Sequence, residues 1–239
     1  MNPDGLIAIG AILALLLVGG GVIGLIDRRN FDWRWLLVAA GLVLIDDALL
    51  TRGWGVIPDL LPGAWNWEGK ILALVATLVI AALPAFGWRR TGLTLMQNKE
   101  GRTTTYIVAL VLCLIFAGLA LMQPTDPLDG ETLGFQLTMP GLEEEAYYRG
   151  ILLFALDMAF RGRARLLGAD WGWGALISCI VFGLAHGFDY SDGAFSLDWM
   201  TFALTGGPAL ILVWMRARTG SLVLPVLLHN FANSIGLLI

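Results

Sequence analysis

Apolar residues gather in eight long runs along the chain, and the connections between them hold most of the charged residues. Most runs have the length, about 17 to 25 residues, that crosses the hydrocarbon core of a bilayer. Backbone groups in lipid find no water to bond, and the runs lack the alternation of barrel strands, so each is expected to be a helix. The pattern predicts an all-α fold, a polytopic membrane helical bundle of about eight transmembrane helices. The predicted spans are Leu6 to Ile26, Trp33 to Leu50, Ile71 to Trp88, Tyr106 to Met122, Leu142 to Phe160, Trp173 to His186, Trp199 to Met215 and Leu222 to Ile239.

Composition supports a lipid environment for most of the chain. The 239 residues are 57% hydrophobic and only 14% charged, whereas a soluble domain carries roughly 25% charged residues. The net charge is −4 and no basic stripe exists, so the expected partner is the lipid bilayer and not nucleic acid. Cys113 and Cys179 lie within apolar runs and are interpreted as small buried hydrophobes. No repeat or soluble domain interrupts the pattern, so residues 1–239 are predicted to form a single membrane domain.

Basic residues fall in alternate connections. They follow the first, third, fifth and seventh runs, whereas the connections after the fourth and sixth runs hold acids without Lys or Arg. The connection after the second run holds only Arg52 and Lys70. Cytoplasmic connections of membrane proteins carry the excess of Lys and Arg. Both termini are therefore predicted to lie outside the cytoplasm.

Several ionisable residues lie within the runs or at their ends, where a charge is costly and usually faces a cavity or a partner. Both histidines of the protein are among them. Such positions are the natural candidates for function. They are Asp46, Asp47, Glu143, Glu144, Glu145, Arg149, Asp157, His186 and His229.

The fifth run opens with Pro140 and three consecutive glutamates. Acids favour the positive end of a helix dipole, so one interpretation is that they only mark a helix start at the interface. Glu145 and Arg149 are four residues apart, which predicts a supporting ion pair on one helix face. Glu144 lies about 100° around an α-helix from Glu145. It is therefore the carboxylate assigned to chemistry.

The two histidines each have a partner four residues away. Phe182 is expected to pack beside His186 on one face of the sixth run, although a histidine there could also simply cap the helix. His229 and Asn233 share a face of the last run, where interhelical hydrogen bonding is the alternative role. Counting 1.5 Å of rise per residue places Glu144 and these polar groups at a similar depth in the outer half of the membrane.

These residue types permit hydrolysis of an amide bond. Glu144 and His186 are expected to activate water as general bases, and His229 and Asn233 to donate hydrogen bonds to the oxyanion. No cofactor is expected, but two histidines and a glutamate could also bind zinc. The His-Glu-x-x-His signature of zinc proteases is absent.

The chain resembles the CAAX prenyl protease and bacteriocin-processing family of intramembrane peptidases, also called the ABI family. The matching motifs are Glu-Glu-x-x-x-Arg at 144–149, Phe-x-x-x-His at 182–186 and His-x-x-x-Asn at 229–233. The resemblance implies a glutamate-type, metal-independent intramembrane endopeptidase with a catalytic core at residues 140–239. Eukaryotic members cut prenylated proteins at the cytoplasmic face, whereas the charge pattern of this chain places the site toward the outer face. The expected setting is therefore a bacterial inner membrane.

The expected substrate is a protein or peptide with a membrane-associated C-terminal segment, such as a hydrophobic sorting helix. Two other classes of function stay open. One is a non-catalytic scaffold or immunity protein with the same fold, although such a protein need not retain all four candidate residues. The other is a transporter with a path lined by Asp46, Asp47 and Asp157, for which inverted repeats would be expected and none is visible.

Overall fold

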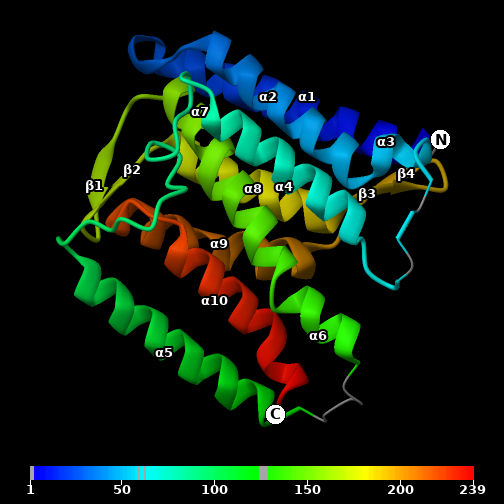
Figure 1. Ribbon diagram of the computed structural model, residues 1–239. Coiled ribbons are helices and arrows are strands. Elements are labelled where there is room, and N and C mark those ends of the chain that lie inside the picture. Colours follow the sequence, from blue (N-terminus) through cyan, green and yellow to red (C-terminus); the bar gives the residue numbers. More distant parts are fainter. Residues whose placement is uncertain (1–2, 59, 62, 124–128) are drawn as a thin grey trace. The chain divides into compact units, whose positions relative to one another are not determined.

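The computed structural model describes residues 3–58, 60–61, 63–123 and 129–239, and it is built mainly of helices (Figure 1). A helix stands at each of the eight predicted runs, which confirms the all-α bundle. Most ends agree with the prediction within a few residues; the helix of the third run begins four residues early and ends at Ala82. The helices are α1 (Pro3–Ile26), α2 (Trp33–Leu50), α4 (Trp67–Ala82), α5 (Arg102–Ala120), η2 (Pro140–Leu152) continued by α7 (Leu153–Ala159), α8 (Trp173–Gly187), α9 (Trp199–Thr219), and α10 (Val223–Ser234) continued by η3 (Ile235–Leu237).

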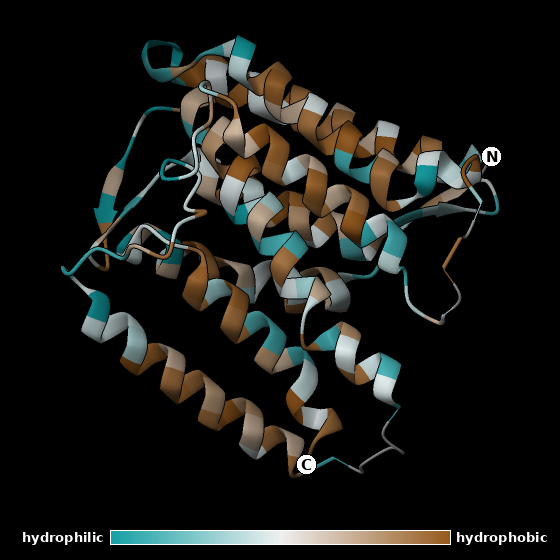
Figure 2. Cartoon of the chain, viewed as in Figure 1, coloured by the Kyte–Doolittle hydropathy of each residue, from teal (hydrophilic) through white to brown (hydrophobic). Residues whose placement is uncertain are grey.

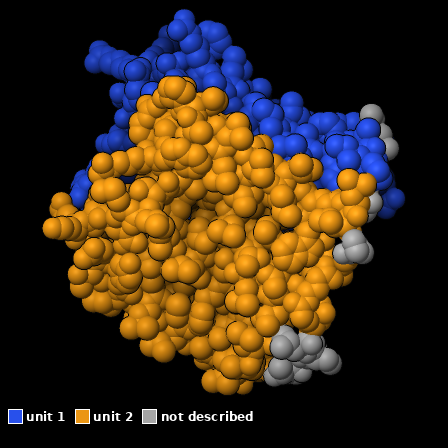
Figure 3. Space-filling model, in the orientation of Figure 1, with its two compact units in different colours: residues 1–58, 151–214 blue, residues 59–150, 215–239 orange. Residues whose placement is uncertain are grey.

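The chain divides into two compact units (Figure 3). Unit 1 comprises Met1–Pro58 and Ile151–Trp214. In it α1 packs against α2 and α8, and α7 packs against α2 and α8. Two short helical segments, η1 (Arg28–Asn30) and α3 (Arg52–Gly55), flank α2. The core of this unit is made of small and aliphatic side chains such as Ala39, Leu156 and Ala159, which are fully buried or nearly so.

Two β-hairpins in unit 1 were not expected from the sequence. Strands β1 (Ala164–Leu166) and β2 (Ala169–Trp171) pair antiparallel, as do β3 (Phe188–Ser191) and β4 (Ala194–Leu197). Asp192 and Gly193 form the second turn, both with positive φ. An Asp-Gly pair is favourable in such a two-residue turn because the left-handed backbone matches the twist of the strands. These connections are therefore ordered hairpins between helices rather than irregular loops.

Unit 2 comprises Asp59–Gly150 and Met215–Ile239. In it α10 packs against α5 and against the short helix α6 (Gly130–Gln136). The segment that precedes α4 is tied to α6 through Glu131, whose carboxylate accepts hydrogen bonds from the Ala64 backbone and the Trp67 indole. The rings of Trp65 and Phe135 stack with centroids 4.8 Å apart. These contacts fix the start of α4 with respect to α6 within this unit.

Apolar side chains also cover outward-facing surfaces. On α5 the side chains of Leu110 and Leu114 are 61% and 65% exposed, and Figure 2 shows hydrophobic residues along most of that helix. Helices α1, α5 and α9 are long and apolar enough, by length and composition, to cross a membrane. Because a soluble protein does not expose such continuous apolar faces, the protein is an integral membrane protein.

The other acids within the predicted runs, Asp46, Asp47 and Asp157, lie in unit 1. Asp47 accepts a hydrogen bond from the Trp54 indole at 2.9 Å, Asp157 pairs with Arg163 at 3.0 Å, and Asp46 is buried in α2.

The two cysteines differ in burial. Cys179 is buried as expected, whereas Cys113 is only partly buried.

Candidate active site

The glutamate-bearing segment is a π-helix, not the α-helix that the sequence analysis assumed. A π-helix has wider turns with i→i+5 hydrogen bonding and is found most often as short stretches at functional sites. The expected 100° separation between Glu144 and Glu145 therefore does not apply to this segment. Both carboxylates instead face the same histidine, His229.

The start of this helix is fixed by Asn230 on α10. Its Oδ1 accepts a hydrogen bond from the Gly141 backbone N–H at 2.7 Å, and its Nδ2 donates to the Thr138 carbonyl at 3.2 Å. The first N–H groups of a helix lack partners within the helix, so Asn230 acts as a cap supplied from another element. The two helices approach so closely that a Cβ atom on Gly141 would lie 2.6 Å from the Val226 carbonyl oxygen.

Glu145 links a buried cation to the imidazole of His229. Its Oε1 lies 2.7 Å from His229 Nδ1 and 3.3 Å from Arg149 Nη1. The side chains of Glu145 and Arg149 are both buried. The predicted Glu145–Arg149 ion pair is thus present. Because an ionised carboxylate can only accept a hydrogen bond, Nδ1 of His229 carries a hydrogen. Nε2 of the same ring lies 3.7 Å from Glu144 Oε2.

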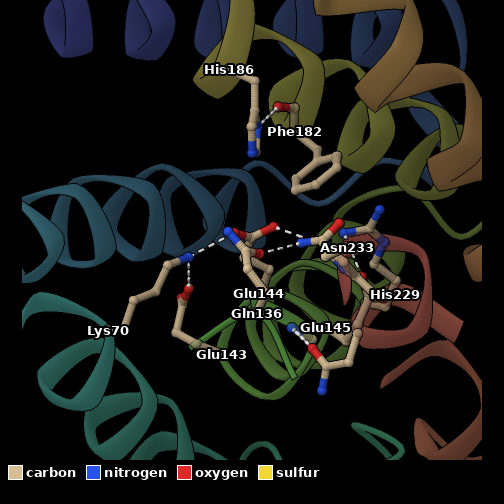
Figure 4. A network of polar contacts seen from close by, with 12 residues as sticks. Lys70, Gln136, Glu143, Glu144, Glu145, Phe182, His186, His229 and Asn233 are labelled. Carbon is tan, nitrogen blue, oxygen red and sulfur yellow. Dashed lines mark hydrogen bonds and ion pairs between the residues drawn. The ribbon is translucent and has the colours of Figure 1, made fainter. Parts of the chain in front are cut away.

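Glu144 lies between His229 and Lys70 (Figure 4). Its Oε2 is 3.7 Å from His229 Nε2, and its Oε1 is 2.7 Å from Lys70 Nζ. The same ammonium group is 2.6 Å from Glu143 Oε2. The Glu144 side chain keeps 11% of its surface exposed, whereas that of Glu143 keeps none. Of these two partners of Lys70, Glu144 is the one that a molecule from outside can reach.

Asn233 lies on the exposed side of α10, and its Nδ2 donates a hydrogen bond to Gln136 Oε1 at 3.1 Å. Gln136 ends α6, whose first residues are capped by Asp129. Hydrogen bonds from the hydroxyl and backbone N–H of Thr132, together with the N–H of Glu131, lower the pKa of Asp129. The cap therefore stays ionised throughout the neutral range.

His186 and Phe182 belong to unit 1, where both lie on α8. Their rings pack edge to face with centroids 4.5 Å apart, as the spacing predicted. His186 Nδ1 lies 2.8 Å from the Phe182 carbonyl oxygen. A carbonyl can only accept, so Nδ1 carries the hydrogen. In the neutral ring Nε2 then holds the lone pair.

The structure thus brings Glu144, Glu145, Arg149 and His229 into one cluster of unit 2. Asn233 joins Gln136 in the same unit, and Phe182 and His186 form a pair in unit 1. Sequence reasoning missed Lys70, Gln136 and Asn230. The position of Lys70 could have been recognised from the sequence. It directly precedes an apolar run, where a positive charge is costly unless it is paired with an opposite charge. Asn230 had the signal of a second amide beside His229 within the last run.

The three motifs and their supporting residues fall in one stretch of the chain. Residues 131–235 match the family model of Rce1-like type II CAAX prenyl endopeptidases. This match confirms the resemblance to the CAAX protease and bacteriocin-processing family. Comparison with curated proteins and with solved structures found no match.

The Rce1-like match covers Glu144, Glu145, Arg149 and His229 but not Lys70. It begins within α6 and ends one residue after α10, so it contains the elements that hold Glu144, His229 and Asn233. A CAAX protease of this family is an intramembrane endopeptidase that acts on a protein or peptide substrate. The match supports that activity at the level of the family.

Proposed function

We propose that this protein is a glutamate-type intramembrane endopeptidase in which Glu144, His186, His229 and Asn233 carry out the chemistry. The observation that carries the proposal is the position of Glu144 between a cation and an imidazole inside a largely buried cluster. Membrane proteins rarely bury so many ionisable groups together unless the groups have a function. The Rce1-like match, which covers Glu144 and His229 but not Lys70, supports this proposal.

In the proposed reaction Glu144 removes a proton from water, and the oxygen of that water attacks the carbonyl carbon of the scissile bond. His186 shares this role, because a neutral ring with its hydrogen on Nδ1 accepts a proton at Nε2. Collapse of the tetrahedral intermediate breaks the C–N bond. The proton taken from water then passes to the leaving amine.

His229 and Asn233 are proposed to stabilise the oxyanion. Glu145 holds Nδ1–H of His229 and forms an ion pair with the ring when it is protonated, so Nε2–H can donate toward the developing charge. The Asn233 amide carries two hydrogens, of which Gln136 accepts one. The second can reach a substrate oxygen from the exposed side of α10.

The proposed chemistry needs no metal ion. The Lys70 ammonium already lies 2.7 Å from Glu144, and a metal ion bound to that carboxylate would be repelled by it. We therefore expect the rate of cleavage to be unchanged by a chelator such as EDTA.

The proposed substrate is a membrane-tethered protein or peptide with an apolar C-terminal segment, cut near the outer face of a bacterial inner membrane. The support for this side of the membrane is the alternation of Lys and Arg among the connections. A prenylated substrate at the cytoplasmic face would require the reverse orientation.

The function is tested by comparing the C-termini of membrane proteins in cells that carry the wild type, Glu144→Gln or His186→Ala. We expect a specific processed C-terminus to disappear in both variants, measured by mass spectrometry, while the protein still inserts in the membrane. Glu100→Gln, an exposed acid in the connection before α5, is the matched control and should process normally. Unchanged processing in Glu144→Gln and His186→Ala would instead favour the scaffold or immunity alternative.

The orientation is tested by single cysteines in a variant without Cys113 and Cys179. A cysteine at Asp192, in the exposed β3–β4 turn, should react with a membrane-impermeant thiol reagent on intact cells. A cysteine at Lys99 should react only after the cells are permeabilised. The opposite pattern would place the termini in the cytoplasm.

A further inference from the structure

Lys70 lies outside the segment that matches the family model, yet it holds the carboxylate assigned to catalysis. We infer that Lys70 is a positioning residue that orients Glu144 for the activation of water. This inference rests on the proposed function. It adds a residue of α4 to a site that the motifs place only on η2, α8 and α10.

The helix that carries Lys70 does not explain its position. Lys70 stands in the first turn of α4, where the helix dipole disfavours a positive charge. An apolar run follows it directly. Its side chain is only 14% exposed, and a largely buried ammonium group is costly unless it is paired and hydrogen-bonded. The partners on η2 are therefore the reason for a lysine at this position.

The two glutamates that bind Lys70 lie where a helix favours a negative charge. Glu143 and Glu144 lie in the first turns of η2, at the positive end of its dipole. The ammonium group contacts one oxygen of each, at 2.6 Å and 2.7 Å. The Lys70 ammonium group thus joins the first turns of α4 and η2, both in unit 2. Its distances to the carboxylate oxygens are typical of charge-assisted hydrogen bonds.

The contact also determines how the Glu144 carboxylate is rotated. Lys70 binds Oε1, and Oε2 lies toward His229 Nε2 at 3.7 Å. Without the ammonium group, the Glu144 carboxylate could rotate away from this orientation. Glu143 and Glu144 would also have less compensation for their negative charges. A misplacement of about 1 Å in a catalytic group can lower the rate by about 10²-fold. The expected defect is therefore in turnover rather than in substrate binding.

A second set of contacts holds Lys70 itself in place. The Asn66 side chain caps α4 by accepting from the Gly69 N–H at 3.1 Å. The Glu131 carboxylate on α6 binds the segment before α4. Lys70 is thus presented by a fixed helix start, as a residue that orients another group must be.

The first test needs no substrate. The chain has two lysines, Lys70 and the exposed Lys99, so the purified protein in detergent is treated with an amine-reactive acetylating reagent and the two sites are read by mass spectrometry. Lys99 should react at least about tenfold faster, because ion pairing holds Lys70 in the unreactive ammonium form. In a Glu143→Gln/Glu144→Gln double variant Lys70 should become reactive. Equal labelling of both lysines in the wild type would overturn the inference.

The second test measures turnover of a synthetic peptide that spans the junction left uncut in Glu144→Gln cells. Lys70→Met should lower kcat by about 10²-fold and change KM by less than about threefold. Lys70→Arg should recover at least about tenfold of that loss because it keeps the positive charge. Lys99→Met is the matched control and should behave as the wild type.

The outcomes separate this inference from the proposed function. If the wild type cleaves and Lys70→Met cleaves equally fast, Lys70 has no positioning role and the peptidase stands. If Lys70→Arg is as slow as Lys70→Met and both unfold at the same temperature, below that of the wild type, the role of Lys70 is structural and the inference is wrong. If Glu144→Gln leaves every C-terminus unchanged, the proposed function fails, and the positioning role fails with it.

Discussion

Replacing Arg149 by methionine should lower the free energy of unfolding by about 3–5 kcal/mol, the usual effect of removing one partner from a buried ion pair. Arg149 and Glu145 are both fully buried and 3.3 Å apart. The variant would leave the Glu145 carboxylate, which also holds His229 Nδ1, with less compensation for its charge. Thermal unfolding in detergent, followed by tryptophan fluorescence, measures the loss.

The matched control is Arg165→Met. Arg165 pairs with Asp170 at 2.9 Å in the first hairpin, but both side chains are more than half exposed. Exposed pairs contribute about 0–1 kcal/mol, so this variant should unfold close to the wild type. A loss for Arg149→Met no larger than the about 0–1 kcal/mol expected of an exposed pair would refute the stabilising role of the Glu145–Arg149 pair.

Gly141→Ala should nearly abolish activity although it adds a single methyl group. The new Cβ would lie 2.5 Å from Asn230 Oδ1 and 2.6 Å from the Val226 carbonyl oxygen. Neither atom can yield easily, because one caps η2 and the other belongs to the α10 backbone. Relief requires α10 to move away from η2, and His229 moves with it. A shift of about 1 Å at such a site costs about 10²-fold in rate.

Gly134→Ala is the control for this prediction. Gly134 lies within α6 of the same unit, and a Cβ there would meet no atom within 4 Å. Alanine also favours a helix more than glycine does, so the variant should keep its activity. Activity is measured with the same processed C-terminus as for Glu144→Gln. Normal processing by Gly141→Ala would contradict the close contact between η2 and α10.

The motifs singled out residues that the structure gathers in unit 2, but they did not predict how those residues are arranged. Glu144, Glu145, Arg149 and His229 were all singled out, and unit 2 brings them together. The 100° separation between Glu144 and Glu145 assumed α-helical turns, whereas η2 has π-helical turns. Glu145, expected only to pair with Arg149, also contacts the histidine.

The residues that sequence reasoning missed are those whose role depends on distant partners. Lys70 was counted only as a charge in a connection, and its partners lie more than seventy residues away. Asn230 sits next to a motif histidine but bonds to residues about ninety positions earlier. The hairpins were missed for another reason, because their turn signals lie within connections judged only by charge.

The sequence by itself determined that the chain lies in lipid, that its runs are helices, and which acid and imidazole side chains are the candidates for chemistry. These conclusions follow from local rules, because the cost of bare backbone groups in hydrocarbon and the cost of intramembrane charge are read from composition and spacing. Only the tertiary structure decided which oxygen of Glu144 meets Lys70 and which ring nitrogen of His229 meets Glu145. Those choices depend on the packing of α4, η2 and α10 around shared charges, and no spacing along the chain encodes the distance between separate helices.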